Sequence, residues 1–456
     1  MDQTRLKLMS DVPVKSAILR LALPTMLGMA VQVIYNLTDT FFIGLLRDTN
    51  LIAAVAVVTP LFLMIQAFGN IFAVGSASYV SRKLGEKDFT EARHTTSVAF
   101  YTSIIVGVVL AAVMVLFKTP LLHAIGTSED TFAPTDGYFT IIAACSVLPV
   151  LQVGLAGLVR SEGATGKSTM GITIGVVSNI ILDPIFIFVF GLGIEGAAWA
   201  TIIGNALGTG YYVLHFFSKK TLLSIRPRDF KPSVRIYGQS LKIGLSAAVN
   251  AIIMGLSMIL ANVLAHQYGD AIVAGNGVQM RINSMCIMLM FGMAQGYQPF
   301  AGFNYGAKNY HRLISGLKTT MVYNTALACF FTLLFVLFGR SFVTAFTDDP
   351  DVINAGTKIL HAFCWGAPFI GLQLTLMTTF QATGKAVRSM LISLGRQCIL
   401  YFPLVLILNA KLGFGGYIYA QPTADVLTTL AALLLSISFI RELRAQHNEL
   451  AAEAVV

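Results

Sequence analysis

Three acidic residues lie inside long apolar stretches of the chain: Asp39, Asp183 and Asp425. A carboxylate in hydrocarbon is costly, so such a residue marks an ion or substrate path by default. A carboxylate can take up and release a proton, and its oxygens suit hard cations. These residues are therefore the first candidates for chemistry.

The first two carboxylates are expected at one depth. Asp183 shares a helix face with Asn179, four residues earlier. Asp39, Asp183 and Thr201 each lie six or seven residues from the outer end of their helix, roughly 10 Å below the surface at ~1.5 Å per residue. Helical spacing adds further residues to the same faces: Gln32, Tyr35 and Asn36 beside Asp39, and Ala197 and Asn205 beside Thr201.

This oxygen-rich cluster predicts ion binding. Two neighbouring carboxylates cannot both ionise cheaply in a low dielectric, so one is expected to hold a proton near neutral pH. The same oxygens, from Asp39, Asn179, Asp183 and Thr201, could instead hold Na⁺. The alternative is that the aspartates are buried, hydrogen-bonded structural groups. The sequence does not choose between H⁺ and Na⁺, and it predicts no cofactor.

Asp425 has a different setting. The region that corresponds to Asp183 in the second half, 400–403, contains no acid. Arg281 and Arg396 lie at a depth similar to that of Asp425. Asp425 either forms a structural ion pair with one of these arginines or is a substrate or coupling carboxylate, and both interpretations are open.

The elements that must position these residues are membrane helices. The chain has 456 residues, of which 55% are hydrophobic and 12% charged, about half the charge of a soluble protein. Apolar stretches long enough to cross ~30 Å of hydrocarbon recur, and in lipid they must be helical. We predict twelve: 14–46, 51–81, 94–117, 135–160, 168–190, 195–218, 236–267, 271–302, 312–339, 353–381, 387–409 and 415–440.

The chain also repeats itself at an offset of about 220 residues. The segment 75–85 aligns with 296–306, 164–167 with 382–385, and 192–196 with 412–416. Six helices per repeat give both halves the same orientation. The predicted organisation is a cytoplasmic segment (1–13), a first lobe (14–218), a linker (219–235), a second lobe (236–440) and a cytoplasmic tail (441–456).

The segment 163–169, Gly-Ala-Thr-Gly-Lys-Ser-Thr, looks like a phosphate-binding loop. The motif requires a glycine where Ser161 stands, and no strand precedes it. We interpret it and its second copy, 382–385, as tight cytoplasmic turns, and expect no nucleotide site.

The positive charge is spread over loops. Most of the 31 Lys and Arg residues fall on one side of the predicted spans, which predicts both termini in the cytoplasm. Binding to a nucleic acid requires a basic face on a folded domain, so no nucleic-acid partner is expected. The residues predicted outside are Arg47, Lys118, Arg340, Lys358 and Lys411.

Two further features bear on transport. Pro24 removes a backbone bond within the first helix and predicts a kink, either static or a hinge. Methionines concentrate in the seventh and eighth helices, where flexible polarisable side chains suit a promiscuous apolar path or core filling equally. They are Met254, Met258, Met280, Met285, Met288, Met290 and Met293.

The chain resembles the multidrug and toxic compound extrusion (MATE) family, closest to its bacterial branches named after DinF and MepA. The resemblance rests on motifs at 21–24, 39–44, 85, 179–184 and 298–306. It implies a V-shaped all-α membrane fold of two six-helix lobes and antiport of organic cations against H⁺ or Na⁺. It places cation coupling on Asp39, Asn179, Asp183 and Thr201, with Gln32 and Ala197 nearby, and a bending proline at Pro24.

One departure concerns the second half. The NorM-type branch uses acids in helices 7 and 10, where this chain has Asn250 and Gln373. A second-lobe Na⁺ site of that type is therefore not expected.

We interpret the chain as a multidrug exporter of the cytoplasmic (inner) membrane that functions as a monomer and is not an enzyme. Its substrates are expected to be small lipophilic cations. Residues suggested for the substrate path are Tyr35, Asn36, Asn205, Met254, Met258, Arg281, Met285, Met288 and Asp425. One alternative is a lipid-linked precursor flippase, which would need a strongly cationic cavity. Another is a membrane-embedded enzyme, for which the single acidic cluster at 348–351 is insufficient.

Overall fold

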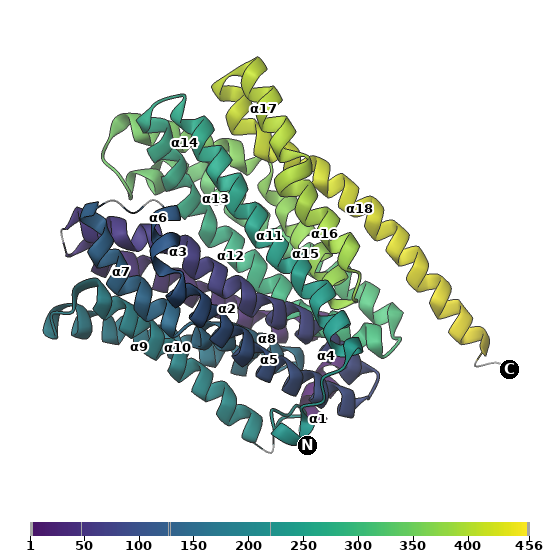
Figure 1. Cartoon of the computed structure of the whole chain (residues 1–456). Coiled ribbons are helices and arrows are strands. Elements are labelled where there is room, and N and C mark those ends of the chain that lie inside the picture. Colours follow the sequence, from purple (N-terminus) through teal and green to yellow (C-terminus); the bar gives the residue numbers. More distant parts are fainter. Residues whose placement is uncertain (1–2, 47, 126, 128, 219, 454–456) are drawn as a thin grey trace. The chain divides into compact units, whose positions relative to one another are not determined.

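The computed structural model describes residues 3–46, 48–125, 127, 129–218 and 220–453. Every element in those ranges is a helix (Figure 1), which confirms the predicted all-α fold. The helices of the first half are α1 (Gln3–Ser10), α2 (Val14–Gly44), α3 (Thr49–Asn70), η1 (Ile71–Ser76), α4 (Ala77–Gly85), α5 (Phe89–Leu116), α6 (Lys118–Ala124), α7 (Glu129–Ala144), α8 (Val147–Ser161), α9 (Thr165–Pro184), η2 (Ile185–Val189) and α10 (Gly193–Phe217).

A short helix, η3 (Pro227–Asp229), lies in the segment predicted as a linker. The second half contains α11 (Val234–His266), α12 (Asp270–Gly306), α13 (Tyr310–Thr344), α14 (Pro350–Cys364), α15 (Ala367–Ala382), α16 (Ala386–Leu394), η4 (Gly395–Ile399), α17 (Tyr401–Leu412) and α18 (Phe414–Glu453). The last helix therefore continues past residue 440, into the segment predicted as a tail.

Eight of the described helices are long and apolar enough to cross a membrane, or ten if each of two bent pairs is one span. The predicted sixth and eighth spans are present as the continuous helices α10, of 25 residues, and α12, of 37. Polar residues such as Asn205 and Arg281 lower their mean hydropathy. All twelve predicted segments thus form helix.

Two predicted spans are bent rather than straight. The break between α7 and α8 is 49°, and the break between α14 and α15 is 53°. Each bend precedes a proline, Pro149 in α8 and Pro368 in α15. Because proline has no N–H, neither can donate to the carbonyl four residues earlier, at Cys145 or Cys364, and the helix bends there.

The internal repeat is visible in the backbone. Lys87 and Lys308 are the only described non-glycine residues with positive φ, at 62° and 55°. Each precedes a capping residue: Asp88 accepts a hydrogen bond from the Glu91 N–H at 3.0 Å, and Asn309 accepts one from the Arg312 N–H at 3.2 Å. The same left-handed turn and cap thus begin α5 and α13.

The structure corrects one alignment. The sequence pairs 164–167 with 382–385, but Gly163 and Gly384 hold the equivalent left-handed turns, with φ of 80° and 79°. Thr165 already begins α9, whereas Thr383 lies in the turn before α16. A backbone with positive φ favours glycine. The two halves are therefore aligned by the glycine of the left-handed turn, rather than by the repeated Ala-Thr-Gly-Lys sequence.

The chain forms two compact units, Met1–Asp11 with Leu27–Ala248 and Val12–Met26 with Val249–Val456. The first has a core that includes Val58, Phe139 and Ile202. The second has a core that includes Ala265, Val405 and Ala424. Helices α2 and α11 each contribute to both units, and the division into functional lobes stays a prediction.

Candidate functional site

Helices α9 and α10 approach closely through glycine. A Cβ atom added to Gly204 would lie 2.5 Å from the carbonyl oxygen of Gly175, so the two backbones are in contact there. Small residues permit such close packing of membrane helices. Asn179 lies one turn beyond Gly175, and Thr201 lies one turn before Gly204. The close crossing therefore brings these two side chains together.

Asn179 bridges its neighbours. The hydrogen-bond network orients its amide so that the nitrogen donates to Asp183 Oδ2 at 2.9 Å. Its oxygen accepts from the Thr201 N–H at 3.1 Å and from the Thr201 hydroxyl at 3.2 Å. The side chain of Asp183 is fully buried, and Asn179 and Thr201 are 2% and 8% exposed. A carboxylate is thus held inside the helix pair by one amide.

Asp39 joins this cluster from α2. It is close enough to Asp183 for their charges to interact, and Tyr35, one turn earlier, lies beside the side chain of Thr201. Both carboxylates also interact electrostatically with Tyr138 of α7. The residues of this cluster all lie in the first compact unit. Two adjacent carboxylates repel each other when both are ionised, so the cluster favours a bound proton or a cation.

Tyr138 was not among the residues predicted from the sequence. The sequence does contain the information needed to predict it. Tyr138 lies near the outer start of the predicted span 135–160, at a depth similar to that of Thr201. A tyrosine offers a hydroxyl that donates or accepts a hydrogen bond. It extends the predicted oxygen cluster to a fourth helix.

The other predicted neighbours take different positions. Ala197 is buried one turn before Thr201, and Asn205 is half-buried one turn after it, with its amide nitrogen unpartnered among the described residues. Gln32 is half-buried and Asn36 is exposed on α2. Pro24 lies inside α2, and the assignment of that helix changes from one compact unit to the other between Met26 and Leu27.

The structure identifies the partner of Asp425. Arg396 Nε lies 2.8 Å from Asp425 Oδ1, and Gln421 donates to the same oxygen at 3.2 Å. Arg281, the other candidate, is exposed on α12. Asp425 is fully buried, so the arginine compensates its charge. The acid of the second unit therefore differs from Asp183, which has no such cation among the described contacts.

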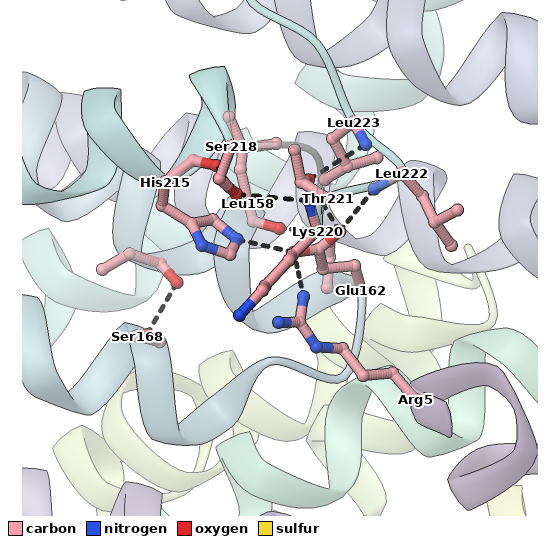
Figure 2. A network of polar contacts seen from close by, with 12 residues as sticks. Arg5, Leu158, Glu162, Ser168, His215, Ser218, Lys220, Thr221, Leu222 and Leu223 are labelled. Carbon is pink, nitrogen blue, oxygen red and sulfur yellow. Dashed lines mark hydrogen bonds and ion pairs between the residues drawn. The ribbon is translucent and has the colours of Figure 1, made fainter. Parts of the chain in front are cut away.

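A polar network around Glu162, at the end of α8, was not predicted (Figure 2). One carboxylate oxygen accepts from Arg5 of α1 at 2.7 Å and lies 2.8 Å from His215 Nε2 of α10. The other accepts from the Thr221 hydroxyl at 2.9 Å and from the Leu222 N–H at 3.1 Å. Glu162 is 1% exposed. One buried carboxylate thus ties the first helix and the segment after α10 to the first compact unit.

The methionines of α11 and α12 differ in their exposure to the surroundings. Met290 and Met293 are buried in the second unit, where they fill its core. Met254 and Met258 of α11 and Met285 of α12 are about half exposed, at 58%, 50% and 45%, while Met288 is half-buried. The exposed group is the one that could contact a substrate.

Several solved structures resemble this fold. One, described as the outward-facing conformation of a multidrug resistance MATE family transporter of the MOP superfamily, is 24% identical with a TM-score of 0.92 and covers 96% of this chain and 98% of its own. Another, described as MATE in the straight conformation, is 26% identical with a TM-score of 0.90, covering 96% and 99%. These matches confirm the predicted membrane-transporter fold.

Curated relatives match over nearly the whole chain. The multidrug export protein MepA of Staphylococcus aureus (strain MSSA476) is 28% identical over 423 residues, 93% of each chain. MepA of Staphylococcus haemolyticus (strain JCSC1435) is 27% identical over 95% of this chain and 96% of its own. The MatE family profile matches residues 24–185 and 246–407, one region in each half. The chain therefore belongs to the MatE family, as the sequence motifs predicted.

Proposed function

We propose that this protein is a secondary active efflux transporter, which exports lipophilic organic cations in antiport with H⁺ or Na⁺. The observation that carries the proposal is the pair of interacting carboxylates, the half-buried Asp39 and the fully buried Asp183, in a membrane chain of the MatE family. Its MepA relatives, described as multidrug export proteins, support drug export, and the cationic character of the drugs is part of the proposal.

The coupling ion binds among Asp39, Asn179, Asp183 and Thr201. Asn179 fixes the orientation of the Asp183 carboxylate through its amide, and Tyr35 and Tyr138 supply hydroxyl groups beside both acids. An ion drives transport only if it binds one conformation more tightly than another. Loss of the ion leaves two carboxylates repelling each other, which changes the balance between conformations.

The conformational change requires an element that reaches from this cluster into the other unit. Helix α2 is that element, because it carries Asp39 in one compact unit and Pro24 in the other. Pro24 cannot donate a backbone hydrogen bond, so bending α2 at this residue requires less energy than bending it elsewhere. We assign it the role of hinge.

The substrate path follows the exposed methionines of α11 and α12. Arg281 lies four residues before Met285 on α12 and belongs to the same path. An apolar surface of flexible thioethers accommodates drugs of different shapes. In the first compact unit, Tyr35, Asn36 and Asn205 are proposed separately as polar groups that contact the substrate. No catalytic step is part of this proposal.

The protein lies in the cytoplasmic membrane as a monomer, with both termini in the cytoplasm. The asymmetric distribution of Lys and Arg supports this orientation. The test of function is efflux from cells that express the chain, with a lipophilic cationic dye and an anionic dye of similar size. Energy-dependent export of the cationic dye alone is expected, and export of neither dye contradicts the proposal.

A further inference from the structure

A cavity of about 310 Å³ lies between the start of α13 and the end of α18. Among the described residues, its lining includes no acidic side chain and four basic ones, which are His311, Lys318, Arg444 and His447. Tyr310 and Leu443 form apolar parts of its wall. The cavity belongs wholly to the second compact unit.

The positive charge of this cavity is uncompensated within the described part of the chain. The nearest acid on α18 is Glu442, one residue before the lining residue Leu443. It is bound by Lys385 and by Arg388, the latter at 3.0 Å. Lys318 and Arg444 themselves are exposed and form no side-chain hydrogen bond or ion pair with a described residue. Gathering like charges costs energy unless an anion binds among them.

An apolar groove of about 500 Å³ continues from the cavity. Lys318 lines both, and the groove then follows α13 past Met321 and Val322 to Thr325, with Leu372 of α15 on its other side. From Lys318 to Thr325 the helix rises about 10 Å. The side chain of Val322 is 64% exposed, so the groove opens outward from the unit.

The position of the two hollows matches the boundary of a membrane. Tyr310 begins one candidate span, and Arg444 lies in the last turns of another, which ends at Glu449. This is the side on which most Lys and Arg residues are predicted. Basic pockets between helices at that boundary suit phosphate head groups, and an adjoining apolar surface suits an acyl chain.

We propose that this cavity and groove form a binding site for one anionic phospholipid, with the phosphate between Lys318 and Arg444 and an acyl chain along α13. The site is independent of the carboxylate cluster of the first unit. A bound lipid here holds the start of α13 against the end of α18, and it stabilises the second unit.

The test uses the purified full-length protein and native mass spectrometry, with thermal stability as a second readout. Phosphatidylglycerol, phosphatidylcholine and free glycerol phosphate are added separately. The wild type is expected to retain phosphatidylglycerol and to gain thermal stability from it. The Lys318→Gln/Arg444→Gln variant lacks two positive charges, and its retention of phosphatidylglycerol should be weaker by on the order of tenfold. Because both side chains are exposed, the variant is expected to fold; Arg444→Gln alone serves as a milder version.

The matched control is Lys358→Gln/Arg441→Gln, which removes two exposed charges of the same unit outside the cavity. It should bind phosphatidylglycerol like the wild type. Equal retention by the cavity variant, or equal loss in the control, overturns the site. Equal retention of phosphatidylcholine overturns the role of the charges, and equal binding of free glycerol phosphate overturns the role of the groove.

Discussion

The amide of Asn179 joins Asp183 to Thr201, with its nitrogen 2.9 Å from Asp183 Oδ2 and its oxygen 3.2 Å from the Thr201 hydroxyl. It is the only hydrogen-bond donor to the Asp183 side chain among the described residues. The position of a buried carboxylate thus depends on one neutral group. This dependence makes Asn179 the most informative residue to change beside the acid itself.

Replacement of Asn179 by alanine removes this donor while leaving the acid in place. We expect efflux to fall strongly, because Asp183 loses its fixed orientation, and stability to fall by about 1–3 kcal/mol. Thermal unfolding in detergent and dye efflux measure the two effects. Thr201→Ser, which keeps the hydroxyl, should retain most activity, and an Asn179→Ala variant with normal efflux contradicts the assigned role.

The contact between Gly175 and Gly204 should be sensitive to a single methyl group. Gly204→Ala places a Cβ 2.5 Å from a backbone oxygen, so α9 and α10 must separate, at a cost of about 1–3 kcal/mol. Efflux should fall because Asn179 and Thr201 move apart. Gly210→Ala lies on the same helix, and no atom of a described residue lies within 4 Å of the added Cβ, so this matched control should be neutral. Equal effects of the two substitutions would refute the packing argument.

The sequence predicted much of this arrangement, and the reasons are physical. Helical spacing fixes which residues of α9 share a face, and distance from a helix end fixes depth, so Asp183 and Thr201 could be placed together. The bends before Pro149 and Pro368 were missed, although each proline lacks a donor. The alignment of the two turns was also wrong. Gly163 and Gly384 are the equivalent residues with positive φ, whereas the repeated sequence suggested that 164–167 corresponds to 382–385.

Contacts between distant segments were harder to predict. Nothing in the spacing of residues shows that Arg396, rather than Arg281, meets Asp425, because that choice depends on tertiary packing of α18 against η4. Glu162 was overlooked for a similar reason: its partners, Arg5 and His215, come from distant parts of the chain. Burial of a charge at a helix end cannot be read from local composition.

The ion pair between Asp425 and Arg396 should be structural. Arg396→Gln leaves a buried carboxylate without its cation and is expected to cost about 3 kcal/mol. Asp425→Asn added to that variant removes the charge and should recover most of the stability, with efflux per folded molecule retained. Thermal unfolding of both single variants and the double variant measures the coupling. Efflux lost in a stable double variant assigns Asp425 to substrate binding instead.

The Glu162 network should anchor helix α1. Glu162→Gln keeps the size of the side chain but removes its charge and the ion pair with Arg5. We expect faster hydrogen exchange in residues 3–10 and in 221–223, measured by mass spectrometry. Lys7→Gln, at an exposed position of α1, is the control and should leave exchange unchanged. Unchanged protection in Glu162→Gln contradicts the anchoring role.

The most direct measurement of the central claim is dye export in vesicles that contain purified wild-type protein or Asp183→Asn, with pH and Na⁺ gradients imposed separately. The account predicts that one of the two gradients drives export by the wild type. It also predicts that neither gradient drives export by Asp183→Asn, although that variant remains folded and monodisperse. Gradient-driven export at the wild-type rate by Asp183→Asn would contradict the account.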